Sequence, residues 1–189
     1  MDVSDPTDRE LVARFRAAND ADSVNELVRR YTGRVRSVVY PLLLDDADAD
    51  DVTQEALVRA IDALGSFRGD AAFATWVYRI AVNTAKNYLK RRNRRRALLT
   101  DEGAPEAVAD AACRTPAQAT ETADLDRAIT AAMARLPFAQ RTAIALVAIR
   151  GLDDREAARA AGCNAATLRW RLHRARQRLR RLLEEEGMA

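Results

Sequence analysis

Apolar residues recur at helical spacing in two separate stretches of this 189-residue chain, and the segment between them, residues 97–121, lacks that period. Apolar positions three and four residues apart indicate amphipathic helices. The intervening segment carries Gly103, Pro105 and Pro116, which are typical of an irregular connection. No part of the chain shows the alternation expected of strands. The pattern therefore predicts an all-α fold of two small helical domains, residues 1–96 and 122–189, joined by an acidic, flexible linker at 97–121.

The same period predicts where the individual helices lie. Residues 8–44 hold two helices, which Pro41 and the aspartates after it are expected to end. Gly65 is expected to end the next helix, because glycine is common at helix C-termini. The remaining helices are predicted over 49–64, 72–95, 122–136, 138–150, 153–161 and 165–183.

Charge is strongly segregated along the chain, although the net charge is only +3. Residues 86–96 hold seven Lys or Arg and no acid, and residues 169–181 hold seven Arg, again without an acid. Residues 45–51 hold five Asp. Basic blocks on helices are typical of surfaces that bind phosphates, whereas DNA would repel the acidic block. The distribution predicts two nucleic-acid surfaces and one acidic surface that binds a protein.

Residues 153–176 have the layout of a helix-turn-helix, with a short helix, a turn at 162–164 and a second helix. Asn164 is placed to accept hydrogen bonds from the free N–H groups that open the second helix. With Leu168 and Leu172 turned toward the core, the first two turns present Arg169, Trp170, His173 and Arg174 outward. Side chains at such positions reach base edges when a recognition helix enters the major groove.

The loop at 66–70 places Phe67 beside Arg68 and Gly69, directly before the first basic helix. An aromatic ring next to cationic side chains is typical of sites that stack an unpaired base and hold its backbone. Composition supports equally well the interpretation that Phe67 is an anchor of the hydrophobic core. Both interpretations stay open at this point.

The residue types that catalysis and metal binding need are scarce. His173 is the only histidine, and Cys113 and Cys163 lie 50 positions apart, so no metal-ligand set can be assembled. No nucleophile motif, acid–base pair or phosphate-binding glycine loop is present. We therefore expect a protein that is not an enzyme and that holds no metal and no cofactor.

The chain begins with an acidic segment, MDVSDPTDRE, that lacks the apolar stretch of a signal peptide. Its longest apolar run, residues 143–149, is far shorter than the roughly 20 residues that a membrane helix needs. The two distant cysteines also argue against a structural disulfide. These features predict a cytoplasmic protein without membrane insertion.

Several motifs, in order along the chain, resemble the extracytoplasmic-function sigma factors of the sigma-70 family. Residues 48–55 (DADDVTQE), 67–70 (FRGD) and 73–89 (FATWVYRIAVNTAKNYL) resemble region 2 of that family. Four further motifs resemble region 4 of the family: Leu136-Pro137, Gly151-Leu152, Gly162-Cys163 and residues 167–176. The resemblance covers about residues 9–95 and 122–183.

The resemblance implies a role in promoter-specific transcription initiation. Region 2 is expected to bind the β′ clamp helices of core RNA polymerase through Asp48, Asp51, Gln54 and Glu55. It is also expected to melt the −10 element and hold a flipped base, with contacts from Phe67, Arg68, Asn83, Lys86, Asn87, Lys90 and Arg91. Region 4 is expected to touch the β flap and to read the −35 element through Thr167, Arg169, Trp170, His173 and Arg174. A cognate anti-sigma factor is a further partner that the family implies.

The sequence departs from the family pattern at the recognition helix. Trp170 stands where the family often has a small residue such as serine, and Ala166 stands where glycine is usual. These departures leave the fold intact, but the −35 sequence and one backbone contact are not carried over from the family to this chain.

Two other functions are compatible with part of the sequence. A dimeric repressor or activator would explain the helix-turn-helix but neither the first basic helix nor the acidic block. An inactive sigma mimic that titrates a regulator would explain the resemblance without promoter opening. The two rivals predict, respectively, a stable homodimer that binds duplex DNA without polymerase, and no promoter opening at all.

Overall fold

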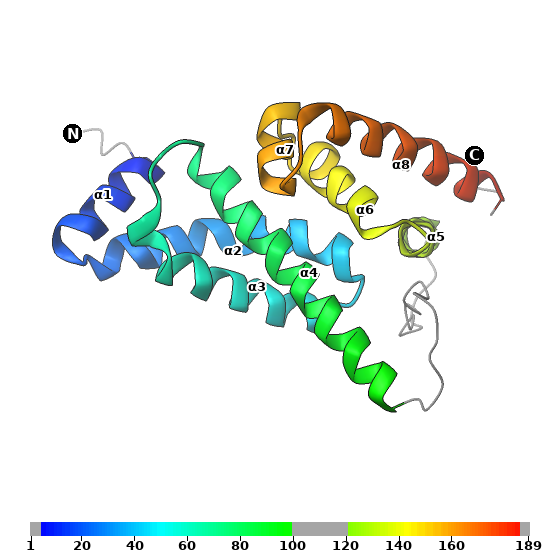
Figure 1. The fold of residues 1–189 in the computed structure, drawn as a ribbon, viewed down its shortest axis with the longest axis horizontal. Coiled ribbons are helices and arrows are strands. Elements are labelled where there is room, and N and C mark those ends of the chain that lie inside the picture. Colours follow the sequence, from blue (N-terminus) through cyan, green and yellow to red (C-terminus); the bar gives the residue numbers. More distant parts are fainter. Residues whose placement is uncertain (1–4, 100–120, 186–189) are drawn as a thin grey trace.

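The computed structural model describes residues 5–99 and 121–185, and every regular element in these two ranges is a helix (Figure 1). The all-α prediction is confirmed. The first range contains α1 (Asp8–Ala18), α2 (Ala21–Leu43), α3 (Asp46–Asp62), the 3₁₀ turn η1 (Leu64–Ser66) and α4 (Phe73–Leu99). The second contains α5 (Glu121–Ala134), α6 (Phe138–Ile144), the π turn η2 (Ala145–Ile149), α7 (Asp154–Ala161) and α8 (Ala165–Glu185).

Several predicted boundaries in the first range are wrong. Helix α3 ends at Asp62, and Gly65 lies inside the 3₁₀ turn η1, so Gly65 does not end that helix. The helix α2 continues through Pro41 to Leu43 and ends where Leu44 adopts a left-handed conformation, with φ 58°. A proline so near the C-terminal end disturbs few of the helical hydrogen bonds. The helix α3 begins at Asp46 rather than at Ala49, so the acidic block forms its first turn. Carboxylates are favourable there, because they interact with the positive end of the helix dipole.

The N-terminal half, α1 to α4, is built around α2, which packs against the other three helices. Valines of α2 supply its centre, and Val35, Val38 and Val39 are fully buried. One end of this core is aromatic: Phe67 and Phe73 are 5.3 Å apart between ring centroids, and Trp76 lies 5.2 Å from Phe67. The loop that carries Phe67 is thereby fastened to the first turn of α4.

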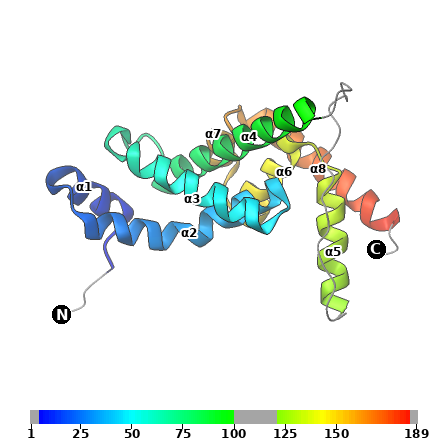
Figure 2. The same cartoon turned by 90° about the horizontal axis from the view of Figure 1, so that it is seen from below.

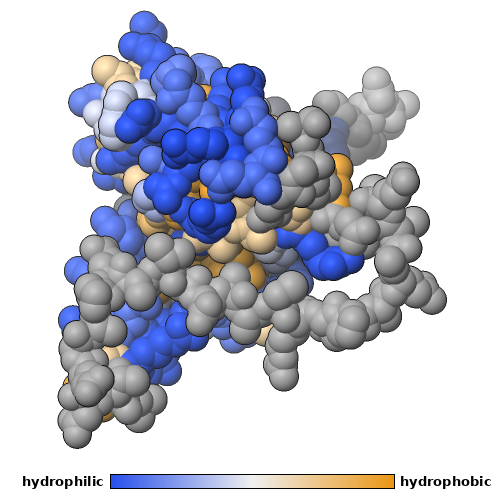
Figure 3. Space-filling view, turned by 90° about the vertical axis from the view of Figure 1, so that its right-hand side faces the viewer, coloured by the Kyte–Doolittle hydropathy of each residue, from blue (hydrophilic) through white to orange (hydrophobic). Residues whose placement is uncertain are grey.

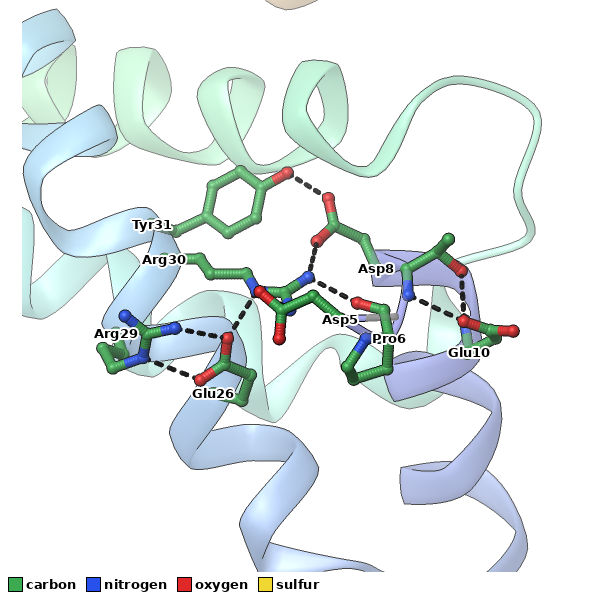
Figure 4. Close-up of polar contacts among 9 residues, drawn as sticks. Asp5, Pro6, Asp8, Glu10, Glu26, Arg29, Arg30 and Tyr31 are labelled. Carbon is green, nitrogen blue, oxygen red and sulfur yellow. Dashed lines mark hydrogen bonds and ion pairs between the residues drawn. The ribbon is translucent and has the colours of Figure 1, made fainter. Parts of the chain in front are cut away.

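Polar contacts hold α1 against α2 (Figure 4). Arg30 of α2 donates to Glu26 at 2.5 Å and to the carbonyl oxygen of Pro6 at 2.6 Å. The hydroxyl of Tyr31 donates to Asp8 at 2.5 Å, which satisfies a phenol whose ring is buried. A capping box between Thr7 and Glu10 begins α1. The start of the described chain is thus fixed to the core by paired polar groups.

The C-terminal half packs α6, α7 and α8 around small side chains. Its buried residues include Leu146, Leu168 and the alanines Ala143, Ala157, Ala160 and Ala175. Small side chains at helix contacts allow the helix axes to approach closely. The predicted helix over 138–150 changes at Ala145 into a π turn, a departure that helical periodicity does not reveal. Helix α5 projects away from the remaining helices (Figure 2).

The two halves are packed against each other. Helices α6 and α7 and the π turn η2 lie on α2 and α4 (Figure 1). Nε of Arg150 donates to the hydroxyl of Tyr78 at 3.0 Å, and Arg159 donates to the backbone oxygen of Asp70 at 3.4 Å. Sequence patterns did not predict this contact. Of the predicted linker, residues 97–99 continue α4, Glu121 begins α5, and the segment between them lies outside the described residues.

Candidate nucleic-acid interface

The predicted helix-turn-helix is confirmed in geometry. Helix α7 ends at Gly162, whose φ of 64° is the left-handed conformation that glycine adopts without steric cost. The backbone N–H of Thr167 donates to the side-chain oxygen of Asn164 at 2.7 Å, so Asn164 caps α8 as predicted. Leu168 and Leu172 are buried against the rest of the domain. The opposite side of α8 is therefore presented to solvent.

We call the outward residues at the start of α8 the recognition face. It consists of Thr167, which is half-buried, and the exposed Arg169, Trp170, His173 and Arg174. Trp170 is 60% exposed, which is unusual for a side chain of such large apolar area. Arg169 pairs with Asp154 of α7 at 3.5 Å across two exposed side chains, a weak contact that a ligand can replace.

A second group of arginines continues along α8. They line an open groove of about 470 Å³ against α6, which we call the arginine groove. Its lining residues are Gln140, Arg174, Gln177, Arg178, Arg180 and Arg181. The hydrophilic surface at the upper end of the molecule in Figure 3 lies on the side where α8 runs in Figure 1. Arg174 is a predicted −35 contact, and Arg178, Arg180 and Arg181 belong to the basic block 169–181 that predicts a nucleic-acid surface, without a more specific role.

The loop after η1 borders a pocket of about 490 Å³, which we call the loop pocket. It brings together Phe67, Arg68, Trp76 and Arg79 of the N-terminal half with Arg159 of α7. Phe67 is only 7% exposed, and its backbone oxygen accepts a hydrogen bond from Arg16. In this structure Phe67 holds the position of a core anchor and forms one wall of the pocket. Arg159 had no sequence signal, because the residue it contacts lies 89 positions away.

The outer side of α4 carries the other predicted −10 residues. Asn83, Lys86, Asn87 and Lys90 are all exposed, at positions three and four residues apart, so they lie along one face of the helix. We call these four residues the basic face of α4. Arg91 differs from them, because it pairs with Glu55 of α3 at 3.0 Å. A residue predicted to touch DNA and a residue predicted to touch polymerase thus contact each other.

The predicted polymerase-binding residues lie on α3, and we call them the acidic surface: Asp48, Asp51, Gln54 and Glu55. Asp51 and Gln54 are exposed. Asp48 is half-buried and accepts hydrogen bonds from Tyr88 at 2.5 Å and from Arg92 at 2.7 Å. Burial, together with the hydrogen bond to Asp48, raises the pKa of Tyr88 to about 12. Half of the acidic surface is therefore already engaged by α4.

Arg141 of α6 is a buried cation that sequence analysis missed. It is 7% exposed, and its Nε has no hydrogen-bond partner among the described residues. Burial lowers the pKa of the Arg141 guanidinium, and the neighbouring charge of Arg92 lowers it further. A cation of this kind has no signature in the sequence, because only the packing of α6 on the N-terminal half buries it.

In the described ranges no helix is both long and apolar enough to cross a membrane. Nor do three His, Cys, Asp or Glu side chains come together there as a metal site requires.

Comparison with known proteins identifies both halves of the chain. The family model for Sigma-70 region 2 matches residues 27–95, and that for Sigma-70, region 4 matches residues 126–179. The RNA polymerase sigma-H factor of Pseudomonas aeruginosa is 35% identical over 182 residues, which cover 94% of each chain. The ECF RNA polymerase sigma-E factor of Escherichia coli (strain K12) is 40% identical over 177 residues, 90% of this chain and 91% of that protein.

Solved structures of related proteins share the fold. CnrH, solved in complex with the cytosolic domain of CnrY, has a TM-score of 0.67 at 26% identity, with 94% of this chain and 97% of that chain covered. The sigma factor RpoE from Bartonella quintana, solved with the anti-sigma factor NepR, has a TM-score of 0.63 at 28% identity, with 85% and 96% covered. Both region models and near-full-length relatives lead to one assignment: the chain belongs to the extracytoplasmic-function sigma factors of the sigma-70 family.

Proposed function

We propose that this sigma factor binds core RNA polymerase through its acidic surface, opens the −10 element with the loop pocket and the basic face of α4, and reads the −35 element with the recognition face of α8. One observation carries the proposal. The chain combines a helix-turn-helix whose outer face has almost no counter-ions with a second, separate basic helix face. A simple duplex reader needs only the first of these. Two readers on one chain give avidity when two DNA elements lie at a fixed spacing.

At the −35 element, the recognition face would lie in the major groove. Arg169 and Arg174 are suited to guanine edges, and each bidentate contact of this kind contributes about 1–3 kcal/mol of base discrimination. Trp170 offers an apolar surface to the same groove, so the preferred sequence should contain a thymine methyl near it. Region 4 would also touch the β flap while α8 is bound to DNA.

At the −10 element, the loop pocket would receive an unpaired base. Unstacking a base costs a few kcal/mol, and contact with an aromatic side chain offsets about 1–3 kcal/mol. Trp76, which is half-buried, and the ring of Phe67 supply the apolar wall, while Arg68 and Arg79 are exposed beside it. The four residues of the basic face of α4 would hold the backbone of the separated strand.

The acidic surface would dock on the β′ clamp helices. Asp51 and Gln54 are exposed and available, whereas Asp48 and Glu55 must exchange contacts with Arg92 and Arg91 to take part. An anti-sigma factor is the other partner that we propose. Two relatives with this fold are described as complexes with another protein, the cytosolic domain of CnrY and the anti-sigma factor NepR.

Open-complex formation tests the proposal most directly. The full chain is combined with core RNA polymerase, promoters are selected from a randomised DNA library, and strand opening is followed by permanganate reactivity of unpaired thymines. We expect opening that depends on both the chain and the polymerase. Absence of binding to core polymerase would reject the proposal, and a stable homodimer that binds duplex DNA alone would favour the repressor. Binding to polymerase without any opening would favour the sigma mimic.

Two variants test the loop pocket. Phe67→Ala should impair opening while the affinity for polymerase stays the same, and an equal loss of both would assign Phe67 to the core alone. Because Phe67 is buried, Arg79→Gln is the cleaner probe, since Arg79 is exposed in the pocket wall. Arg14→Gln, an exposed arginine of α1, is the matched control and should leave opening unchanged.

A further inference from the structure

The arginine groove lies beyond the residues that the recognition face uses. Its arginines, Arg174, Arg178, Arg180 and Arg181, form no ion pair with any described acid, and the groove lining contains no carboxylate. The side-chain oxygen of Gln140 is buried beside them without a hydrogen-bond partner among the described residues. Four unpaired guanidinium groups around one open space have the charge and the donors that phosphates require.

The groove is continuous with the recognition face. Trp170, Arg174, Gln177 and Arg181 follow one another at intervals of three and four residues, so they form one stripe along α8. Arg174 belongs to both surfaces. A ligand that lies on the recognition face and extends along the helix therefore meets the groove next.

The length of α8 decides what that ligand meets. Its 21 residues span about 31 Å, whereas the major groove of DNA is about 12 Å wide. When α8 enters the groove with its N-terminal turns, as recognition helices of this kind do, its C-terminal half lies outside the groove. The groove of DNA is bordered by its sugar–phosphate backbone, so the phosphates are the nearest chemistry.

We propose that the arginine groove binds DNA phosphates that flank the −35 element. This inference rests on the proposed reading of that element by α8. Contacts to phosphates fix the register and raise affinity but carry no base preference. The arginine groove thus supplies affinity, and the recognition face supplies specificity.

Salt dependence separates the two roles. The polymerase complex of the full chain is titrated with a selected promoter and with a scrambled −35 duplex at several salt concentrations. The slope of log affinity against log salt is negative, and each lost phosphate contact should reduce its magnitude by about 0.9. Arg178→Gln with Arg181→Gln should reduce the magnitude by about 1.8, with the preference for the selected promoter unchanged. The control is Arg14→Gln, an exposed arginine of α1, which should leave the slope unchanged.

An unchanged slope in the double variant would overturn the inference, as would an equal change in the control. Weaker binding of an acidic protein with unchanged DNA binding would also overturn it, since the groove would then be a protein site. If the wild-type complex shows no preference for any −35 sequence, the proposed function itself fails, and that result is distinct from the first three.

The interface between the two halves carries a second, independent inference. Arg141 lies close enough to Arg92 there that the charge of Arg92 lowers the pKa of the Arg141 guanidinium. The Nε atom of each is buried without a hydrogen-bond partner among the described residues. Asp48 is the carboxylate bonded to Arg92, at 2.7 Å between side chains that are 19% and 23% exposed. Like charges repel strongly where water is excluded, so Asp48 lowers the repulsion that the closed interface must sustain.

Asp48 also belongs to the acidic surface. A partner with basic side chains that binds this surface competes with Arg92 for the same carboxylate. Withdrawal of Asp48 leaves the charge of Arg92 near Arg141 without the carboxylate that offsets it. Separation of the halves would relieve that repulsion, and it would also remove Arg159 from the wall of the loop pocket.

We infer that Asp48 couples polymerase binding to opening of the interface between the two halves, through Arg92 and Arg141. The coupling rests on the proposed use of the acidic surface. It would release α8 and the loop pocket to reach two separate promoter elements at the moment when polymerase is bound.

Energy transfer between dyes on α1 and on the C-terminal end of α8 measures the coupling in the full chain without DNA. Asp48→Asn should raise the open fraction severalfold without polymerase. The matched control, Asp46→Asn, removes an exposed acid of α3 that pairs with Arg36 and should leave the open fraction unchanged. Adding Arg141→Met to Asp48→Asn should restore the closed form, because the second cation is gone.

Equal opening by Asp48→Asn and Asp46→Asn would overturn the coupling, as would an Asp48→Asn chain that Arg141→Met does not close. Core polymerase is then added to the wild-type chain. Opening by polymerase supports the full inference. In the remaining case, polymerase binds and leaves the halves closed while Asp48→Asn opens them. That result would reject the acidic surface as the docking site but would keep the role of Asp48 in holding the two halves together.

Discussion

The two basic helices α4 and α8 look alike in sequence and differ in the structure. In α4, Arg91 and Arg92 point at acids of α3 and form ion pairs at 3.0 Å and 2.7 Å. In α8, only Arg169 has an ion pair with a described acid, and that contact is exposed. A block of arginines is therefore available to a ligand only if no acidic helix lies opposite it. Part of α4 is structural, whereas most of α8 is free.

The hydrophobic cores of the two halves also differ, in the size of their side chains and in their polar contacts. Around α2 the core is built from valines, leucines and interlocking aromatic rings, and Arg30 donates hydrogen bonds to Glu26 and to the oxygen of Pro6. Around α8 the core relies on alanines and a few leucines. The N-terminal half therefore has larger side chains to lose and more ion pairs to break. Substitutions should have larger effects on its stability.

The largest effect should come from the aromatic cluster. Phe73→Ala removes a ring that contacts Tyr31 at 5.2 Å and Phe67 at 5.3 Å between centroids. We expect a loss of about 3–5 kcal/mol in the free energy of unfolding, measured by urea denaturation. Ile149→Ala, at a 46% exposed position in the C-terminal half, should change it by less than about 0.5 kcal/mol. Similar losses in the two variants would show that the loss at Phe73 does not come from its burial in the aromatic cluster.

The next largest difference in stability should lie between a paired arginine of α2 and an unpaired arginine of α8. Arg30→Met leaves Glu26 and the oxygen of Pro6 without their donor, at a side chain that is 15% exposed. The expected loss is about 1–3 kcal/mol. Arg178→Met in α8 should be neutral within about 0.5 kcal/mol, because no described acid loses a partner. Equal losses by thermal denaturation would show that α8 also uses its arginines for stability.

Arg141→Met should stabilise the protein, in contrast to the preceding variants. It replaces an unpaired buried cation by an apolar side chain of similar length, so we expect a gain of about 1–2 kcal/mol in the free energy of unfolding. The control is Arg135→Met, since Arg135 is exposed and pairs with Glu185 at 3.5 Å, a contact of little energetic weight. A loss of stability in Arg141→Met would mean that Arg141 has a partner that stabilises it.

The cap of α8 should have a smaller effect. Asn164→Ala removes the oxygen that accepts from the backbone of Thr167 at 2.7 Å. The expected loss is about 1 kcal/mol, and Asn164→Gly should lose only a few tenths. Denaturation followed by circular dichroism distinguishes the two, and equal losses would show that the backbone of the turn matters more than the cap.

The smallest effect concerns pH. Hydrogen bonds from Arg29 and Arg30 lower the pKa of Glu26 from 4.5 to about 2. A carboxylate whose pKa is lowered by folding stabilises the fold at pH values above its pKa in the unfolded chain. This contribution is lost as the pH falls from 4.5 through 2. The stability difference between the wild type and Glu26→Gln should therefore be constant near neutral pH and shrink below pH 4.5. A difference that stays constant down to pH 2 would contradict the assignment.

The repeated helical period was enough to predict the helices and the helix-turn-helix, because a 3.6-residue pattern and a cap at Asn164 are local properties. Helix ends were less predictable. The proline at Pro41 and the acids after it were expected to interrupt the chain, yet the packing of α2 and α3 absorbs both. The π turn after Ile144 has no periodic signature either.

By itself, the sequence determined the family, the all-α fold and the surfaces that carry charge, since these depend on residue types and on short spacings. The tertiary structure decided which of those charges are free. It placed α3 opposite α4, so that Arg91 and Arg92 became ion-paired, and it left the arginines of α8 facing solvent. It also buried Arg141 and brought Arg159 to the loop pocket. Such pairings join residues tens of positions apart, and only the packing of the helices brings them together.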